Sequence, residues 1–139
     1  MEALATAARV LRHRDLAAGR VDAELERRGV PPAERRRALV ALERAGLVDD
    51  RRVAETRAAA LAERGYGDEA IRWRLGEEGV PEEVAEEAMA RLEPERLRAE
   101  RVLEREGRSP RTLRLLARRG FGQDALEGAA WQTEGRALG

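Results

Sequence analysis

Apolar side chains recur along the chain at spacings of three and four residues, and short glycine-containing breaks interrupt them. Val21 and Leu25, and later Ile71 and Leu75, have the i, i+4 spacing that places side chains on one face of an α-helix. Strong helix formers (Ala, Leu, Glu and Arg) dominate, whereas β-branched and aromatic residues are few. The pattern predicts an all-α protein with helices at about 2–13, 18–28, 32–45, 50–64, 68–78, 82–92, 95–106, 110–119 and 122–132.

The breaks contain residues that start and stop helices. Six glycines follow stretches of helical periodicity, where a left-handed residue commonly ends a helix: Gly29, Gly46, Gly65, Gly79, Gly107 and Gly120. The expected start signals are Pro31 and Pro81 in first turns, Asp49 or Asp50 as a cap, and Ser109 followed by Pro110. Because each predicted helix is short, the helices must pack on one another to persist.

The predicted helices repeat. The segment 19–43 returns in 68–93, and a shorter third copy begins at Ser109. Positions that match between the first two copies include Val21, Leu25, Gly29, Val30 and Pro31 with Ile71, Leu75, Gly79, Val80 and Pro81. In the third copy Leu116, Gly120 and Phe121 fall over Leu75, Gly79 and Val80. An internal repeat of this kind is typical of stacked helical units.

We therefore predict three tandem three-helix repeats, stacked into an elongated and curved array. The predicted boundaries are 1–48, 49–93 and 94–132, followed by a flexible tail at 133–139. Large apolar side chains are few for this length, which favours thin cores in small units. The alternative is one compact nine-helix bundle, in which the repeat is only an evolutionary trace.

The composition excludes much chemistry. The 139 residues include no cysteine and one histidine, His13, so disulfides, thiolate metal sites and cysteine nucleophiles are ruled out. The one serine, Ser109, is already explained as a helix cap. Gly65 and Gly67 precede a helix but lack the strand, third glycine and lysine of nucleotide-binding loops. We expect no catalytic residues, no metal site and no cofactor, and hence a protein that is not an enzyme.

The chain also lacks targeting signals. Residues 1–8 have no basic segment followed by an apolar one, as a signal peptide would. No window approaches the roughly 18 uncharged apolar residues that a membrane span needs. We expect a soluble, cytoplasmic protein with no membrane contact.

Charge is balanced overall but uneven along the chain. The 27 basic residues, all Arg, cancel 27 acidic ones, and the net charges are +1 for 1–50, −4 for 51–93 and +3 for 94–139. The third segment is thus the candidate for contact with phosphates or acidic side chains. The same pattern suits a merely solvated surface, because arginine without lysine is typical of a GC-rich genome. The zero net charge argues against strong binding to DNA alone.

Trp73 lies off the predicted apolar face. It is two residues from both Ile71 and Leu75, which turns it about 200° from each on a helix. With Arg72 and Arg74 on either side, it is a candidate exposed anchor for a partner, although it could also pack on a neighbouring unit. The other aromatic residues at unit ends are predicted to lie in the core: Tyr66, Phe121 and Trp131.

Several linked motifs resemble the RecX family of regulators of the RecA recombinase, over about Ala7 to Trp131. The junction of the first two units carries them in order: Leu47, Asp49, Asp50, Arg52 and Ala54, then Arg64-Gly65-Tyr66-Gly67, Ile71, Leu75 and Gly79-Val80. The opening Leu11-Arg12-His13-Arg14 and the closing Ala117-Arg118-Arg119-Gly120-Phe121 are also similar to the family. The chain departs from the family at Val53, where Phe is usual, at Ala70, where Arg is usual, and at Glu34, where an apolar residue is common.

The resemblance implies a protein that binds the RecA nucleoprotein filament along its groove and limits filament growth, strand exchange and coprotease activity. We expect this protein to be a monomer. An elongated array suits such a partner, since it can touch several subunits at once. The predicted partner-binding residues are Arg72, Trp73, Arg74, Arg108, Arg111, Arg114, Arg118 and Arg119. Beside the filament, the third repeat is a candidate for a weak DNA contact. Two other functions stay open: a direct nucleic-acid-binding module, and a helical-repeat adaptor for another protein.

Overall fold

The structure is a computed structural model that describes residues 2–11 and 15–138, apart from the side chains of Val10 and of residues 131–138. Arg12, His13 and Arg14 of the opening motif, and the predicted core position of Trp131, lie outside what is described. In the described residues the chain forms the helices α1 (Glu2–Leu11), α2 (Ala18–Arg27), α3 (Pro32–Arg44), α4 (Asp50–Glu63), α5 (Asp68–Glu77), α6 (Glu82–Ala90), α7 (Glu95–Glu106), α8 (Pro110–Arg118) and α9 (Gln123–Leu138).

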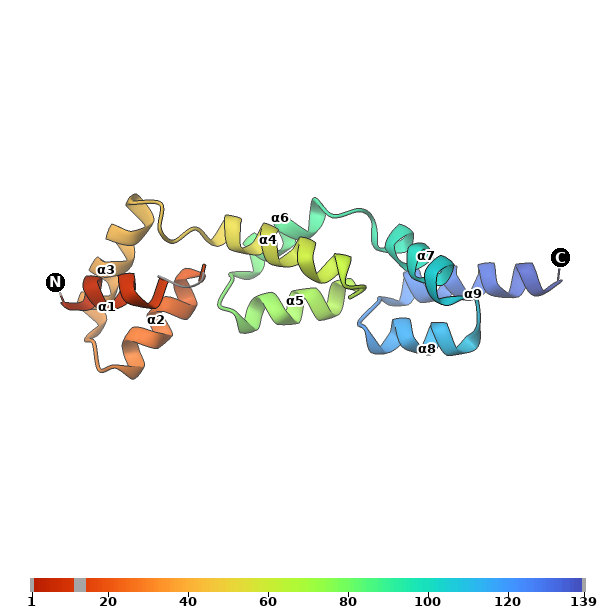
Figure 1. The fold of residues 1–139 in the computed structure, drawn as a ribbon, viewed down its shortest axis with the longest axis horizontal. Helices are drawn as coiled ribbons and strands as arrows, with labels where there is room; N and C mark the ends of the chain where they lie inside the picture. Colours follow the sequence, from red (N-terminus) through yellow and green to blue (C-terminus); the bar gives the residue numbers. More distant parts are fainter. Residues whose placement is uncertain (1, 12–14, 139) are drawn as a thin grey trace.

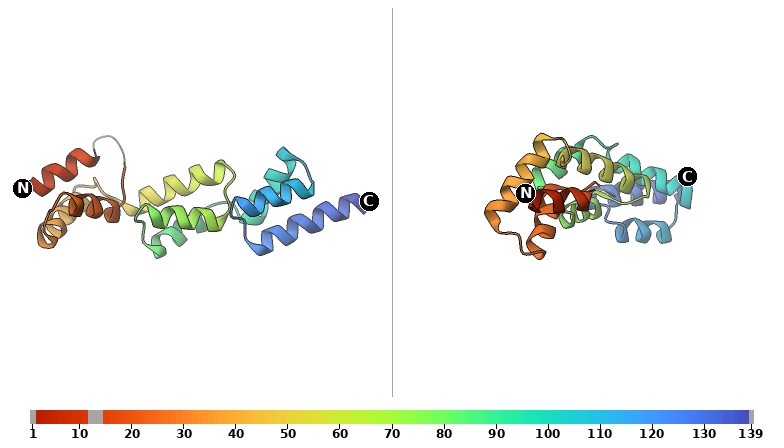
Figure 2. Two further views of the ribbon diagram at one scale, coloured as in Figure 1. Left: turned by 90° about the horizontal axis from the view of Figure 1, so that it is seen from below. Right: turned by 60° about the vertical axis from the view of Figure 1, so that its left-hand side comes forward.

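The helices pack in three triplets, α1–α3, α4–α6 and α7–α9, which we call the first, second and third units. Figures 1 and 2 show the units in a row, with α1 at one end and α9 at the other. The described residues contain no strand. The prediction of an all-α protein built from tandem three-helix repeats in an elongated array is confirmed, and the compact nine-helix bundle is ruled out.

Each unit has its own small core, centred on the middle helix. Val21 and Leu25 of α2, and Ile71 and Leu75 of α5, are fully buried, and Leu116 of α8 occupies the matching place in the third unit. The positions that repeat in the sequence are the buried ones, so the sequence repeat reflects a hydrophobic core that recurs in each unit. The predicted core position of Phe121 is confirmed at 3% exposed, and Tyr66 packs half-buried at the edge of the second core.

The predicted start and stop signals act as expected. All six glycines named above have positive φ, between 74° and 101°, and each follows a helix. Asp49 caps α4 by accepting a hydrogen bond from Arg52 N at 3.1 Å, and Ser109 caps α8 by accepting one from Thr112 N at 3.3 Å. Pro31 and Pro81, expected in first turns, lie just before them, at the N-cap positions of α3 and α6.

The end of the chain differs from its prediction. Residues 133–138, expected to be an irregular tail, continue α9, which runs from Gln123 to Leu138. Glu134, Arg136, Ala137 and Leu138 favour a helix, and they outweigh Thr133 and Gly135, which do not.

The first and second units meet where the start of α2 lies against the end of α5. A Cβ added to Gly19 would lie 2.8 Å from the carbonyl oxygen of Gly79, so the two backbones touch. Ala18 N donates to Oδ1 of Asp50 at 2.7 Å, and Arg20 Nη1 donates to the Glu77 carbonyl oxygen at 3.3 Å. We call this contact the first joint.

The second joint, between the second and third units, has the same plan. At the start of α5, Gly67 N donates to the Arg119 carbonyl oxygen at 2.8 Å and Glu69 N to that of Gly120 at 3.0 Å. Asp68 N donates to Oε2 of Glu95 at 2.6 Å, as Ala18 N does to Asp50. In both joints the N–H groups left free at a helix start are satisfied by the next unit.

The joints place the middle helices in line. Figure 1 shows α8 and α5 following one another along the lower side of the molecule, and the chain contacts put the end of α8 against the start of α5 and the end of α5 against the start of α2. The three middle helices therefore follow one another end to end, in the order opposite to that of the units.

Candidate partner-binding surface

Three of the predicted arginines share the outer face of α8. Thr112 and Leu116 are buried on the inner face, and Arg111, Arg114 and Arg118, spaced i, i+3 and i+7, lie on the opposite side. All three are exposed, and none forms an ion pair with a described residue. We call these three residues the α8 arginine face. Its uncompensated positive charge makes it a surface for anionic groups.

A surface cavity adjoins this face. It has a volume of about 360 Å³ and is lined by Glu106, Ser109, Arg111, Thr112, Leu115 and Arg118. Arg111 and Arg118 thus lie on the rim of one hollow, about two helical turns apart, where acidic groups of a partner could contact them.

Arg108, also predicted to bind a partner, has a structural role instead. Its side chain is 12% exposed and pairs with Glu100, and Nη1 of Arg108 lies 3.2 Å from Oε2 of Glu100. The hydrogen bonding to Glu100 raises the pKa of the Arg108 guanidinium. Because its charge is already compensated inside the third unit, we leave Arg108 out of the candidate surface.

Arg119 is separated from the α8 arginine face by the fold. Its carbonyl oxygen accepts the hydrogen bond from Gly67 in the second joint. Its guanidinium extends over Gly65, where Nη1 lies 2.7 Å from the place a Cβ of Gly65 would take. Arg119 therefore belongs to the joint, and its side chain is considered with that joint below.

Trp73 stands on the outer face of α5. Its exposed fraction is 66%, whereas Ile71 and Leu75 on the inner face are fully buried, so the prediction that it lies off the core face is confirmed. It corresponds in the second unit to Arg114 in the third, as the match of Leu75 with Leu116 shows. An indole that is exposed to this extent is a suitable anchor for a partner.

The arginines beside Trp73 are both held by the second unit. Arg72 pairs with Glu86 of α6. The Arg74 guanidinium lies 4.5 Å from the centre of the Tyr66 ring, and its Nη2 lies 3.3 Å from the Tyr66 hydroxyl. These contacts engage both guanidinium groups within the second unit, so neither is a free cation beside Trp73.

The ion pair of Arg72 and Glu86 makes the folding stability depend on pH. Hydrogen bonding to Arg72 lowers the pKa of Glu86 below its ordinary value of 4.5. The folded chain thus binds fewer protons here than the unfolded chain, and this contribution to stability, present above pH 4.5, is lost as the pH falls through the lowered pKa. In urea unfolding at pH 6 and pH 3, Glu86→Gln should lose less stability between the two pH values than the wild type, by at most about 1 kcal/mol because the pair is half-exposed. Equal losses in the two proteins would contradict the assignment.

Sequence reasoning missed the most buried cation. This cation is Arg98 of α7, which is 7% exposed. It pairs with Asp68, and it donates from Nε to the Glu93 carbonyl oxygen at 2.8 Å and from Nη1 to that of Tyr66 at 3.1 Å. A signal was present: Arg98 lies four residues before the buried Val102, on the apolar side of α7.

The described residues bring together no group of three or more His, Asp or Glu side chains suited to a metal ion. None of the described helices has the length and apolar character required to cross a membrane.

Comparison with known proteins identifies the family. The regulatory protein RecX of Chromohalobacter salexigens is 36% identical to this chain, and the match covers 91% of each protein. The chain belongs to the RecX family. Residues 49–89 match the family description for the second three-helix domain of RecX, which is the segment whose motifs carried the resemblance. RecX proteins are regulatory proteins and not enzymes, as the composition predicted.

Solved RecX structures have the same fold. The crystal structure of RecX from Lactobacillus salivarius superposes with a TM-score of 0.80 at 16% identity, covering 96% of this chain and 95% of that one. A second crystal structure of regulatory protein RecX gives a TM-score of 0.75 at 19% identity and covers 91% of this chain and 70% of that one. The tandem array of three-helix units is thus the architecture of RecX proteins.

Proposed function

We propose that this RecX protein binds the RecA nucleoprotein filament and inhibits the recombinase and coprotease activities of RecA in DNA repair and the SOS response. The observation that carries the proposal is the family membership, established over nine-tenths of the chain. The shape supports it, because three units in a row present a long surface that suits a repeating partner and can gain avidity from several contacts.

The contact surface in this proposal consists of Trp73 and the α8 arginine face. They occupy matching positions on α5 and α8, which follow one another along one side of the molecule. Trp73 supplies an apolar anchor, and the arginines supply charge for acidic groups of the filament. The protein acts as a monomer in the cytoplasm, where the filament forms. In agreement, the exposed large apolar residues among those described are spread over all three units: Val40, Leu47, Trp73 and Leu97.

Co-sedimentation tests the proposal. The purified chain is mixed with RecA, single-stranded DNA and a slowly hydrolysed nucleotide, and parallel samples omit RecA or DNA. We expect the chain to pellet with the assembled filament and to stay in solution with bare DNA. Failure to pellet with any filament sample would overturn the proposal.

Charge reversal of the α8 arginine face should weaken filament binding. In the triple variant Arg111→Glu, Arg114→Glu and Arg118→Glu, the three exposed cations become repulsive toward acidic groups, and the apparent affinity in co-sedimentation should fall at least about tenfold. The matched control is Arg36→Glu, Arg37→Glu and Arg44→Glu on α3, which makes the same change of charge at exposed sites of the first unit. An equal loss in both triples would show a general effect of charge and contradict the surface.

Trp73→Ala is the second variant for the same assay. It removes the exposed indole without touching the core, so the helix content and thermal unfolding should stay as in the wild type, while filament affinity falls about tenfold. Unchanged affinity would remove Trp73 from the contact surface.

A direct nucleic-acid-binding role is the second candidate, and the unpaired α8 arginine face favours it. Such a protein would bind bare DNA. Its affinity would fall steeply as salt rises, because binding releases the counterions condensed on the DNA phosphates. Bare-DNA binding with a steep salt dependence and no preference for the RecA filament would decide for this candidate.

A further inference from the structure

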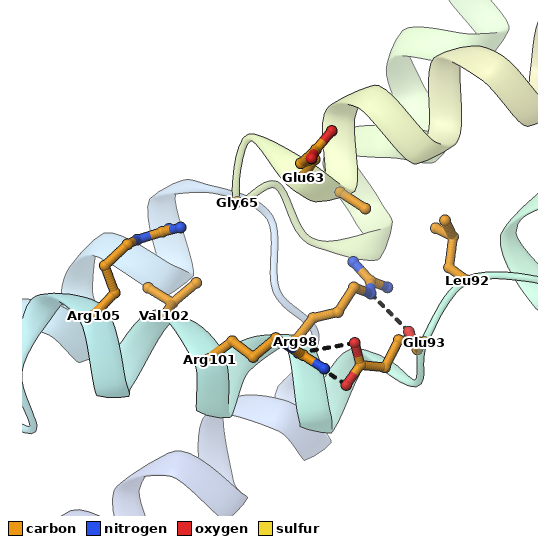
Figure 3. A pocket seen from close by; sticks show the side chains of 9 residues that line it. Glu63, Gly65, Leu92, Glu93, Arg98, Arg101, Val102 and Arg105 are labelled. Atoms are coloured by element: carbon orange, nitrogen blue, oxygen red, sulfur yellow. Dashed lines mark hydrogen bonds and ion pairs between the residues drawn. The ribbon is translucent and has the colours of Figure 1, made fainter.

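The second joint contains a cleft whose charges are only partly compensated. It lies between the C-terminal end of α4 and α7, has a volume of about 340 Å³, and is shown in Figure 3. Its lining is Ala62, Glu63, Gly65, Leu92, Glu93, Arg98, Arg101, Val102 and Arg105. Three arginines from one face of α7 thus point toward the same hollow.

Two of these arginines are fully engaged by the protein. Arg98 is held by Asp68 and by two backbone carbonyl oxygens, as described above. Arg101 pairs with Glu93 at 2.9 Å. In Figure 3 the dashed lines connect both to Glu93, and Arg105 has none. The remaining positive charge of the cleft is therefore that of Arg105.

Arg105 is joined at the mouth of the cleft by Arg119. Among the described residues, Arg105 forms one ion pair, a long one of 3.6 Å with the neighbouring Glu106. The Arg105 side chain is 55% exposed. Nη2 of Arg105 and Nη1 of Arg119 both lie within 3.4 Å of the point where a Cβ of Gly65 would be. No carboxylate of a described residue pairs with Arg119. Two like charges brought this close, one of them unpaired, favour an anion between them.

The positive φ of Gly65, +89°, ends α4 and already accounts for the glycine. The absence of a side chain has a second effect, because it leaves the space that the two guanidinium groups occupy. An alanine here would meet Arg119 at 2.7 Å.

We propose that the cleft is a binding site for an acidic peptide segment of a protein partner, with a carboxylate held between Arg105 and Arg119. Beyond the arginines, the lining includes the half-buried Ala62 and Leu92 and the buried Val102, so an apolar side chain next to the carboxylate finds apolar groups to contact. Glu63, which forms no ion pair with a described residue, borders the cleft and would repel the successive phosphates of a nucleic acid, which favours a peptide with separate carboxylates. The site thus predicts that the partner carries an acidic peptide segment. This inference rests on the proposed function in one respect, namely that the partner is a protein.

Fluorescence polarisation tests the site without RecA. The probes are a labelled peptide of alternating Glu and Leu, the same peptide with Gln for Glu, and labelled oligothymidylate. The wild type should bind the Glu peptide and bind the Gln peptide at least about tenfold more weakly. Arg105→Gln with Arg119→Gln should lose the Glu peptide by a similar factor. Arg36→Gln with Arg37→Gln, a matched removal of two exposed arginines on α3 of the first unit, should keep it.

The single variant Arg105→Gln controls for a folding defect in the double variant. Its side chain is half-exposed and holds no other unit in place, so the variant should fold and still lose several-fold in peptide binding. Equal binding of the Glu and Gln peptides, unchanged binding by both Arg105 variants, or a preference for oligothymidylate that depends on Arg105 would each overturn the site. A chain that binds the peptide but not the RecA filament would refute the proposed function and leave the site standing, and the reverse result would refute the site alone.

Discussion

Gly67→Ala should break the second joint while leaving the units folded. An added Cβ would lie 2.5 Å from the carbonyl carbon of Gly120, and this neighbour is backbone that cannot swing away. The φ of Gly67, −87°, suits any residue, so the effect is a steric one between units. We expect a loss of about 2 kcal/mol in the free energy of unfolding, and a urea transition that separates into two steps because the third unit no longer gains from its neighbour.

Gly76→Ala is the matched control. Gly76 lies in the same helix, α5, but a Cβ there meets nothing within 4 Å. This substitution should be neutral or stabilise the protein by up to about 1 kcal/mol, as expected when glycine is replaced within a helix. Circular dichroism in urea separates the two variants. Similar unfolding curves for both would contradict the close backbone contact at the joint.

Arg98→Met should be the most damaging change of a charged residue. It removes a cation that is 7% exposed and leaves the Asp68 carboxylate and the carbonyl oxygens of Tyr66 and Glu93 without their donor. Because Asp68 is one-third exposed and water can reach it, we expect a loss of about 2 to 3 kcal/mol, below that of a fully buried pair.

The control for Arg98 is Arg101→Met, one turn further along α7. Arg101 also forms an ion pair, with Glu93, but its side chain is 70% exposed. Its replacement should cost less than about 1 kcal/mol, as for other surface pairs. Equal costs for the two variants, measured by thermal or urea unfolding, would show that burial of Arg98 contributes nothing.

The fold was largely predictable from the sequence because its signals are local. Gly29 and Gly79 mark matching helix ends, and Val21 and Ile71 mark matching buried faces, so the repeat could be recognised from spacing alone. The extension of α9 was missed because glycine and the end of the chain were given more weight than the helix formers around them.

The candidate surface was only partly predictable. The exposure of Trp73 and the shared face of Arg111, Arg114 and Arg118 follow from helical periodicity. The roles of Arg98 and Glu95 depend on partners about thirty residues away in the chain, which no local pattern identifies. The pairing of Arg108 with Glu100 likewise depends on how α7 turns into α8.

The joints also bear on how RecX sequences diverge. Both joints are made chiefly of backbone groups and glycines, with one acidic side chain at the start of the next unit, Asp50 or Glu95. Substitutions on the outer faces of α2, α5 and α8 therefore change which groups are displayed without changing the distance between units. The surface chemistry of such a molecule can therefore diverge while the spacing of its units is conserved. A fold retained at 16% identity, with a TM-score of 0.80 over nearly the whole chain, is what such a construction allows.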